Sequence, residues 1–513
     1  HPEHVGRLMI VDSLPFFGVM MAPDATPETV RPIAEQLRTM LSGQTGDQPA
    51  PPNMSLTDAG RARIAAWMST ANHRVAGQAA YEDLTSDLRA DVPAIGRVPT
   101  TVLYAVPNPA MAAMVLATFA GAYAAAKAEM ACRRARAESD FPLLAPHLET
   151  LLDLTREAAA AKAAAFAIPP YDALLDDYEP GARAADLDVI FADLAAFLPD
   201  FLARALERQA ARGAPLPLPG PFGQAAQQEL GRRLMTALGF DFTHGRLDVS
   251  LHPFTGGVPD DVRITTRYDE ADFTRALMGV LHETGHALYE RGLPAAWRRQ
   301  PVGEPRGMVL HESQSLLMEM QVCRGPAFLT FAAPLLREAF HGEGPAWTEA
   351  NLFAHYRRVA RGLIRVDADE VSYPLHIVLR YRLERALLSG DLAVRDLPAA
   401  WGEGMRGLLG VAPPDDRSGC LQDIHWPGGA FGYFPTYTLG ALAAAQFYAA
   451  ARAQDGTIEP GIAAGDFRPL LAWLRAKVHG LGSFKTTGEV IAQATDAPLG
   501  TAAFKAHLTA RYG

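Results

Sequence analysis

The stretch Leu281-His282-Glu283-Thr284-Gly285-His286 decides how the rest of the chain is interpreted. It contains an H-E-x-x-H motif, whose two histidines lie four residues apart and therefore on one face of a helix. Two imidazoles at that spacing can occupy two corners of a tetrahedral zinc site. Glu283 lies on the same turn, where its carboxylate can act as a general base toward water. The alternative is an exposed helix face that carries His and Glu by chance.

The motif lies in the middle of a predicted helix. Apolar residues recur near the helical period between residues 272 and 291, and Gly292 and Pro294 then give a stop signal. Gly279 and Gly285 lie inside this helix, although glycine there costs about 1 kcal/mol relative to alanine. We therefore hypothesise that another segment packs closely against the helix backbone.

Two histidines need a third protein ligand to complete a catalytic zinc site. The metzincin arrangement requires Gly and His three and six residues after the second motif His, but Tyr289 and Gly292 hold those positions. The other common arrangement takes a Glu from a later helix. The sequence 311–314 (His-Glu-Ser-Gln) begins such a predicted helix, which runs to about Arg324, so Glu312 is the candidate third ligand. Alternatively, Glu312 is an acid stabilised by the dipole at a helix N-terminus.

Composition indicates an ordinary globular protein. Of the 513 residues, 49% are hydrophobic and 20% charged, and the formal net charge is -10. Without a basic run that could bind phosphates, nucleic acid is not expected as a partner. The three cysteines are far apart and odd in number, which is typical of a reducing compartment. No run of 18 apolar residues and no secretory leader pattern occurs, so we expect no membrane association and a cytoplasmic location.

The chain is predicted to be mainly helical, with one small β element. Helices are expected over 26–42, 55–76, 77–93, 108–137, 142–166 and 186–212. The Gly- and Pro-rich stretch 213–220 is the clearest linker, which suggests an N-terminal region 1–220 and a catalytic region 221–513. Further helices are predicted over 222–238, 349–366, 374–388, 396–409 and 435–454, followed by three shorter ones.

Two short stretches before the H-E-x-x-H helix have the alternating pattern of strands. They are 247–251 and 262–266, with Gly256-Gly257 and Pro259-Asp260 as turn signals between them. A small hairpin or sheet is therefore expected beside the metal site.

The chain resembles the M32 metallocarboxypeptidases of the carboxypeptidase Taq type. Six short motifs of that family occur in the same order, and together they make a coincidence implausible. They are His252-Pro253-Phe254, Asp261-Val-Arg263-Ile-Thr265, His282-Glu283-Thr-Gly-His286, His311-Glu312-Ser-Gln314, Ile364-Arg365-Val-Asp-Ala-Asp369 and Gly419-Cys-Leu-Gln422-Asp423-Ile-His425-Trp426.

The resemblance implies a fold and an activity. The fold would be a gluzincin-like α-helical protein, split by a long substrate groove with the zinc at its floor, and assembled as a homodimer. The activity would be the removal of single amino acids from peptides with a free C-terminal carboxylate, supported by Zn²⁺ or, as a substitute, Co²⁺.

Peptide hydrolysis by such a site needs several further groups. Glu283 would take a proton from the attacking water and pass it to the leaving amine. The tetrahedral oxyanion needs a hydrogen-bond donor besides the metal. Tyr433 is the first candidate and His425 the second, whereas the alternative for Tyr433 is an aromatic residue packed in its loop.

A carboxypeptidase must also recognise the terminal carboxylate of its substrate. Arginine suits this role because its planar fork can pair with both oxygens. Arg365 is the favoured candidate, against the alternative of a structural ion pair with Asp367 or Asp369. Arg263 is the other candidate, or it lines the end of the groove and limits substrate length. His252 is either a groove residue or a structural histidine.

Two other functions fit part of the pattern. An oligopeptidase or dipeptidyl carboxypeptidase of similar fold would share the zinc ligands. A catalytically silent peptide-binding protein would not need a base at Glu283, so the intact motif argues against it.

Overall fold

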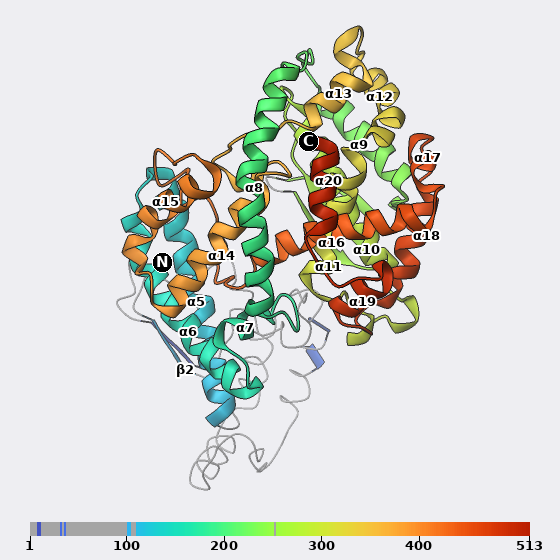
Figure 1. Cartoon of the computed structure of the whole chain (residues 1–513). Helices are drawn as coiled ribbons and strands as arrows, with labels where there is room; N and C mark the ends of the chain where they lie inside the picture. The colour runs from blue at the N-terminus through green and yellow to red at the C-terminus, as the bar shows by residue number, and fades with distance from the viewer. Residues whose placement is uncertain (1–7, 12–30, 33–34, 37–99, 104–108, 251–252) are drawn as a thin grey trace, which may run out of the picture. The chain divides into compact units, whose positions relative to one another are not determined.

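The computed structural model describes residues 8–11, 31–32, 35–36, 100–103, 109–250 and 253–513 (Figure 1). The helices predicted over 55–76 and 77–93, most of that predicted over 26–42, and His252 lie outside these residues. The chain divides into two compact units, residues 1–161 with 424–429 and residues 162–423 with 430–513. The predicted boundary near residue 220 does not coincide with this division, because the stretch 213–220 lies within the second unit.

The first unit contains two short parallel strands and long helices. Strand β1 (Leu8–Val11) pairs with β2 (Thr100–Leu103). Helix α5 (Pro109–Glu138) follows, and α6 (Ala145–Phe166) begins in this unit and ends in the second. Both helices agree with the predictions for 108–137 and 142–166.

Two helices of the second unit, Pro170–Leu175 and Pro326–Phe340, were not predicted, whereas those over 184–212, 224–238, 273–292, 373–389, 397–409 and 435–454 begin and end close to the predicted limits. The unit is mainly helical, and its helices are numbered in chain order. They are α7 (Pro170–Leu175), α8 (Ala184–Arg212), α9 (Gln224–Leu238), α10 (Phe273–Gly292), α11 (Gly307–Leu316), the π-helix η8 (Leu317–Cys323), α12 (Pro326–Phe340), α13 (Glu349–Tyr356), α14 (Tyr373–Ser389), α15 (Leu397–Leu409), α16 (Pro435–Gln454), α17 (Ile458–Ala463), α18 (Arg468–Lys477), α19 (Thr487–Thr495) and α20 (Ala502–Tyr512). Four shorter helices, rather than three, follow α16. No helix in the described part of the chain is long and apolar enough to cross a membrane.

The prediction of a helix over 349–366 was wrong for its second half. Helix α13 ends at Tyr356, and the backbone of Val359 instead bonds the side chain of Gln209 on α8. Val359 N donates to Gln209 Oε1 at 2.8 Å, and Gln209 Nε2 donates to Val359 O at 2.9 Å. A side-chain amide 150 residues away thus replaces the helical partners of this residue.

The small β element is a three-stranded sheet in the order β3-β5-β4. Strand β3 (Gly245–Val249) runs parallel to β5 (Asp261–Thr266), and β4 (Phe254–Val258) runs antiparallel to β5. The predicted turn at Gly256-Gly257 was wrong, because both glycines pair within β4. The turn between β4 and β5 lies at Pro259-Asp260, as predicted.

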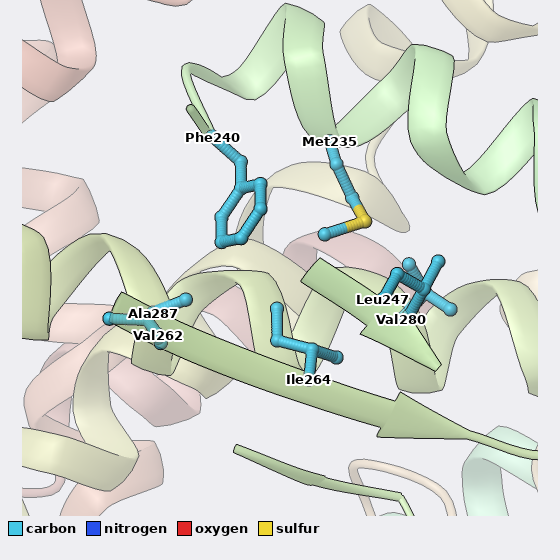
Figure 2. Packing of buried hydrophobic residues seen from close by; sticks show 7 residues of the cluster. All are labelled: Met235, Phe240, Leu247, Val262, Ile264, Val280 and Ala287. Atoms are coloured by element: carbon cyan, nitrogen blue, oxygen red, sulfur yellow. The ribbon is translucent and has the colours of Figure 1, made fainter. Parts of the chain in front are cut away.

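One face of this sheet packs against the H-E-x-x-H helix. Figure 2 shows the side chains of β3 and β5 meeting α9 and α10 in a single cluster of buried residues, which are Met235, Phe240, Leu247, Val262, Ile264, Val280 and Ala287. Burial of such residues contributes roughly 1.5–3 kcal/mol for each large side chain. The cluster therefore fixes the sheet on the side of α10 that carries no metal-binding side chain.

Helix α11 lies between α10 and α16, and a glycine allows the close approach on each side. A Cβ on Gly285 of α10 would collide with Gln314 O and would lie 2.6 Å from Ser315 Cα on α11. A Cβ on Gly440 of α16 would lie 2.7 Å from Glu312 Cβ. The hypothesis of a closely packed segment is thus confirmed at Gly285. It was wrong at Gly279, where the nearest atom, Pro253 Cγ, is 4.0 Å away.

This difference predicts opposite effects for two alanine substitutions on the same helix. Gly285→Ala should lower the free energy of unfolding by about 1–3 kcal/mol, because the added methyl group overpacks the α10–α11 contact. Gly279→Ala has room for its methyl group and should raise it by up to about 1 kcal/mol, the helix-propensity gain. Urea unfolding of both variants measures these changes, and equal effects would contradict the packing described.

Candidate active site

Helix α10 presents the two motif histidines on one face. Asp272 caps the helix by accepting a hydrogen bond from Thr274 N at 2.9 Å, and this cap sets where the helical phase begins. The rings of His282 and His286 then lie edge to face, with their centroids 5.0 Å apart and their planes at 80°. Both rings are partly buried, with side-chain exposures of 21% and 13%, so the site is screened from solvent but remains accessible.

Glu312 of α11 meets the two histidines. Its Oε2 lies 3.4 Å from His286 Nε2 and 3.9 Å from His282 Nε2, and one ligand atom from each residue lies within 4.8 Å of the others. Two ligand atoms of a tetrahedral zinc, each about 2.0–2.2 Å from the ion, lie about 3.3–3.6 Å apart. The three side chains therefore have the spacing of a metal-ligand set.

The other ring nitrogen of each histidine already has a partner. His282 Nδ1 lies 2.9 Å from Glu319 Oε2. His286 Nδ1 lies 2.7 Å from His311 Nδ1, and His311 Nε2 lies 2.8 Å from Glu290 Oε1. Because the Nδ1 atoms are engaged, the Nε2 atoms of both rings are directed at the same point beside Glu312. These residues fit a bound divalent metal in both donor type and orientation.

The electrostatics of the three side chains favour a positive charge at their centre. Burial lowers the pKa of His282, but Glu319 and Glu312 outweigh it and raise that pKa to about 10. Burial raises the pKa of Glu312, but the hydrogen bond with His286 and the charge on His282 lower it to about 2. The buried carboxylate therefore stays ionised beside the two imidazoles.

Glu283 lies next to the two histidines, and a strand residue holds its carboxylate. Thr255 of β4 places its Oγ1 2.5 Å from Glu283 Oε2 and 3.0 Å from Glu283 O. Residue Glu283 is 8% exposed and is thus largely removed from water. The sheet therefore fixes one oxygen of the candidate base.

The loop before α16 carries Tyr433, which packs edge to face against two other tyrosines. Its ring centroid lies 4.9 Å from that of Tyr178 and 5.2 Å from that of Tyr437. Burial, with smaller contributions from Tyr437 and Glu312, raises the pKa of Tyr433 far above its usual value. Burial also raises the pKa of Tyr437 to about 12, with Arg365 opposing and Glu312 adding to the shift. Both hydroxyls therefore stay protonated, and a hydrogen bond between the two contributes to both shifts.

Arg365 is buried, and its ion pair differs from the predicted alternatives. Its Nε and Nη2 lie 2.9 and 2.8 Å from Asp423 Oδ1. Asp367 instead pairs with Arg275 at 3.0 Å, and Asp369 accepts hydrogen bonds from nearby backbone N–H groups. The alternative of a structural ion pair therefore occurs, but with Asp423 rather than with Asp367 or Asp369.

Asp423 is shared by a second arginine from α14. Arg380, which is fully buried, donates from Nε to Asp423 Oδ2 at 2.6 Å. Burial lowers the pKa of Arg380 to about 10, although Asp423 opposes this shift. One carboxylate thus faces two guanidinium groups, and the cluster keeps an excess of positive charge.

The other two described candidates are Arg263 and His425. Arg263 is exposed on β5 and pairs with Asp261 at 2.7 Å. His425 lies in the segment Ile424–Gly429, which belongs to the first unit, whereas the other described site residues belong to the second.

Several residues at the site were not found from the sequence. Glu319, Glu290, Thr255 and Tyr437 had no assigned role, and His311 was quoted only as part of a motif. The spacing of Tyr433 and Tyr437, four residues apart at the start of a predicted helix, was a usable signal.

The fold and the site define a helical metallopeptidase in which a glutamate from the next helix joins an H-E-x-x-H pair. The family model of the carboxypeptidase Taq (M32) metallopeptidases matches residues 54–512. The chain belongs to this M32 family, which confirms the resemblance seen in its motifs, and it is accordingly a metallocarboxypeptidase, a peptide hydrolase.

Individual relatives agree along most of the chain. Thermostable carboxypeptidase 1 of Thermus thermophilus is 43% identical over 402 residues, which are 76% of this chain and 78% of the relative. Carboxypeptidase 1 of Bacillus subtilis is 36% identical over 395 residues, covering 75% and 77%. Among solved structures, metallocarboxypeptidase 1 of Trypanosoma cruzi has a TM-score of 0.76 at 36% identity, covering 95% of this chain and 99% of that one. An M32 carboxypeptidase of Deinococcus radiodurans has a TM-score of 0.73 at 33% identity, covering 94% and 98%.

Proposed function

We propose that this protein is a zinc-dependent carboxypeptidase that removes single C-terminal amino acids, with Glu283 as the general base. The observation that carries the proposal is the convergence of His282, His286 and Glu312 beside the Glu283 carboxylate. Two imidazoles and one carboxylate form a donor set of catalytic zinc sites, which keep a fourth position open. Co²⁺ accepts the same donors and is the expected substitute.

The residues of the chain divide the chemistry between them. Zinc held at this site would polarise the scissile carbonyl and lower the pKa of a bound water to about 7. Glu283 takes the proton of the attacking water on its carboxylate and delivers it to the leaving amine nitrogen. Thr255 keeps that carboxylate in place through its hydrogen bond to Oε2.

Tyr433 is our first candidate to donate a hydrogen bond to the negative charge that develops on the carbonyl oxygen. Its phenol is neutral and can donate, and Glu312 lies close enough to contribute to raising its pKa, which supports a place near the ligand set. His425 is the second candidate.

Arg365 is our candidate for binding the substrate carboxylate. If Arg365 alone neutralised Asp423, no positive charge would remain for the substrate carboxylate. Because Arg380 also pairs with Asp423, the two arginines carry one positive charge more than this carboxylate neutralises. The remaining positive charge beside Tyr437 supports recognition of a carboxylate at this point.

Arg365→Ala should therefore change selectivity more than general activity. The ratio of kcat/KM for a free-acid peptide to that for its C-terminally amidated form should fall by about 10- to 100-fold, the value of a hydrogen bond to a charged group. Arg275→Ala is the matched control. Arg275 of α10 pairs with Asp367, which lies in the same loop as Arg365, and the loss of this exposed ion pair should leave the ratio unchanged. Equal losses on both peptides for Arg365→Ala would remove Arg365 from this role.

Mass analysis of the products from one free-acid peptide, with and without a chelator, tests the proposed function. Successive release of single residues, abolished by the chelator, is the expected result. Release of dipeptides would indicate a dipeptidyl carboxypeptidase, and internal fragments would indicate an oligopeptidase. Bound zinc without hydrolysis of any peptide would indicate a silent binding protein.

The homodimer, the cytoplasmic location and the groove roles of Arg263 and His252 stay predictions. Sedimentation analysis of the purified protein addresses the first of these directly.

A further inference from the structure

Helix α11 does not end as an α-helix but continues as the π-helix η8. Glu319, the partner of His282 Nδ1, lies on this π-helix, and its other oxygen accepts a hydrogen bond from Arg324 Nη2 at 2.5 Å. π-Helices are rare and occur mostly as single turns within α-helices, frequently at functional sites. The position of Glu319 therefore depends on what stabilises η8.

Few backbone N–H groups are available to the carbonyl groups at the end of η8. The N–H of Arg324 bonds Glu319 O at 3.2 Å, and the N–H of Gly325 bonds Val322 O at 2.9 Å. The next residue, Pro326, has no N–H. Carbonyls at a helix end that lack backbone donors require a side chain or water instead.

Arg511 of α20 supplies those donors. Its Nη1 donates to Met320 O, and its Nη2 donates to Gln321 O at 3.2 Å. The Arg511 side chain is 7% exposed, so these bonds are shielded from water. A guanidinium group with a fixed fork of donors suits two neighbouring carbonyls better than a lysine would.

The same guanidinium group also reaches the loop that carries Arg365. Arg511 Nη1 lies 3.0 Å from Glu370 Oε2, and the Glu370 side chain is 2% exposed. Tyr512 OH donates to Glu370 Oε2 at 2.8 Å, and His507 Nε2 lies 2.8 Å from Glu370 Oε1. Although burial raises the pKa of Glu370, the charges of Arg511 and His507 lower it well below its usual value. Helix α20 thus holds η8 and the loop of residues 365–371 together.

We propose that Arg511 is a positioning residue for the metal site, which acts through η8 and Glu319 on the imidazole of His282. The inference rests on the proposed role of His282 as a metal ligand. Arg511 has no bond to the candidate ligands, but without it the two carbonyls lose their donors and η8 loses the contact that fixes its turn. Glu319 would then no longer hold the Nδ1 atom of His282, and the ligand would lose its orientation.

The dissociation constant for Zn²⁺ tests this proposal, measured on the full chain by competition with a chromogenic chelator. Arg511→Met keeps most of the side-chain volume but removes all donors, and its zinc Kd should rise by about 10- to 100-fold, as is typical for residues that orient metal ligands. Arg511→Lys keeps a charged donor on a single nitrogen but not the planar fork that reaches two carbonyls, so it should give a smaller increase and serves if Arg511→Met does not fold. An unchanged zinc Kd in either folded variant would overturn the proposal.

Lys505→Met is the matched control on the same helix. Lys505 pairs with Asp193 of α8 at 2.6 Å, so this change weakens the docking of α20 without affecting η8. Both variants should unfold at lower temperature, but only the Arg511 variants should bind zinc more weakly. Equal zinc Kd values for Arg511→Met and Lys505→Met, at whatever stability, would mean that Arg511 has a structural role only.

A double-mutant cycle with Glu319→Gln tests the route of the effect. If Arg511 acts through Glu319, the increase in zinc Kd for Glu319→Gln with Arg511→Met should be well below the product of the two single increases. A full product would contradict that route. Zinc binding by the unaltered protein separates the two hypotheses: its absence would refute the proposed metal site and with it this inference, whereas tight binding that the Arg511 variants leave unchanged would refute only the role of Arg511.

Discussion

Glu283→Gln should lower kcat by about 10²- to 10⁴-fold, the contribution of general acid–base catalysis. An amide cannot take the proton of the attacking water, yet it has nearly the same shape as the carboxylate. Its oxygen can still accept the hydrogen bond from Thr255 Oγ1, so the side chain should stay in place. Steady-state kinetics on a free-acid peptide measure the loss, and the metal content of the same sample should be unchanged.

Glu338→Gln is a suitable control for the chemical change itself. Glu338 forms an exposed ion pair with Arg233 and has no contact with the site residues described. It should keep the kcat of the unaltered protein. If Glu283→Gln also kept it, Glu283 would not be the base.

Glu312→Gln should abolish zinc retention at neutral pH and, with it, peptide hydrolysis. The amide oxygen is a much weaker metal ligand than a carboxylate, and the substitution removes the negative charge that faces both imidazoles. We expect the zinc Kd to rise by more than the roughly 10- to 100-fold typical of residues that only orient ligands. Equilibrium dialysis against buffered zinc measures this.

The zinc Kd of Glu312→Gln should be compared with that of Glu319→Gln. Glu319 is also buried and also contacts His282, but through Nδ1 rather than at the metal position. Its zinc Kd should rise less than that of Glu312→Gln. The reverse order would mean that the metal lies on the other side of the His282 ring.

The central part of the site could be predicted from the sequence because it follows from local rules. The spacing of His282 and His286 places both on one face of any helix, and Asp272 and Gly292 mark where that helix begins and ends. Glu312 needed one further assumption, that the next helix packs against α10. Gly285 gave a local indication of that contact.

The residues around the ligands could not be predicted in the same way. Glu319 reaches His282 only because η8 is π-helical, and no periodicity in the sequence indicates that change of helix type. The contact between His286 and His311 depends on the angle at which α10 and α11 pack. The pairing of Arg365 with Asp423 joins residues 58 positions apart. Such contacts are set by tertiary packing rather than by local propensity.

The small sheet shows the same limit at the level of secondary structure. Gly256-Gly257 is a strong turn signal in isolation. Within β4, however, a Cβ on Gly257 would collide with Asp261 O, so the glycine serves a close approach between neighbouring strands. The strand pairing that reveals this is not visible in a local pattern.

Anomalous diffraction at the zinc absorption edge, from crystals of the zinc-loaded protein, tests the central claim most directly. The account predicts one strong peak within bonding distance of His282 Nε2, His286 Nε2 and a carboxylate oxygen of Glu312, with Glu283 beside it and not bound to it. A peak bound by any other set of residues, or a peak that Glu312 does not contact, would contradict it.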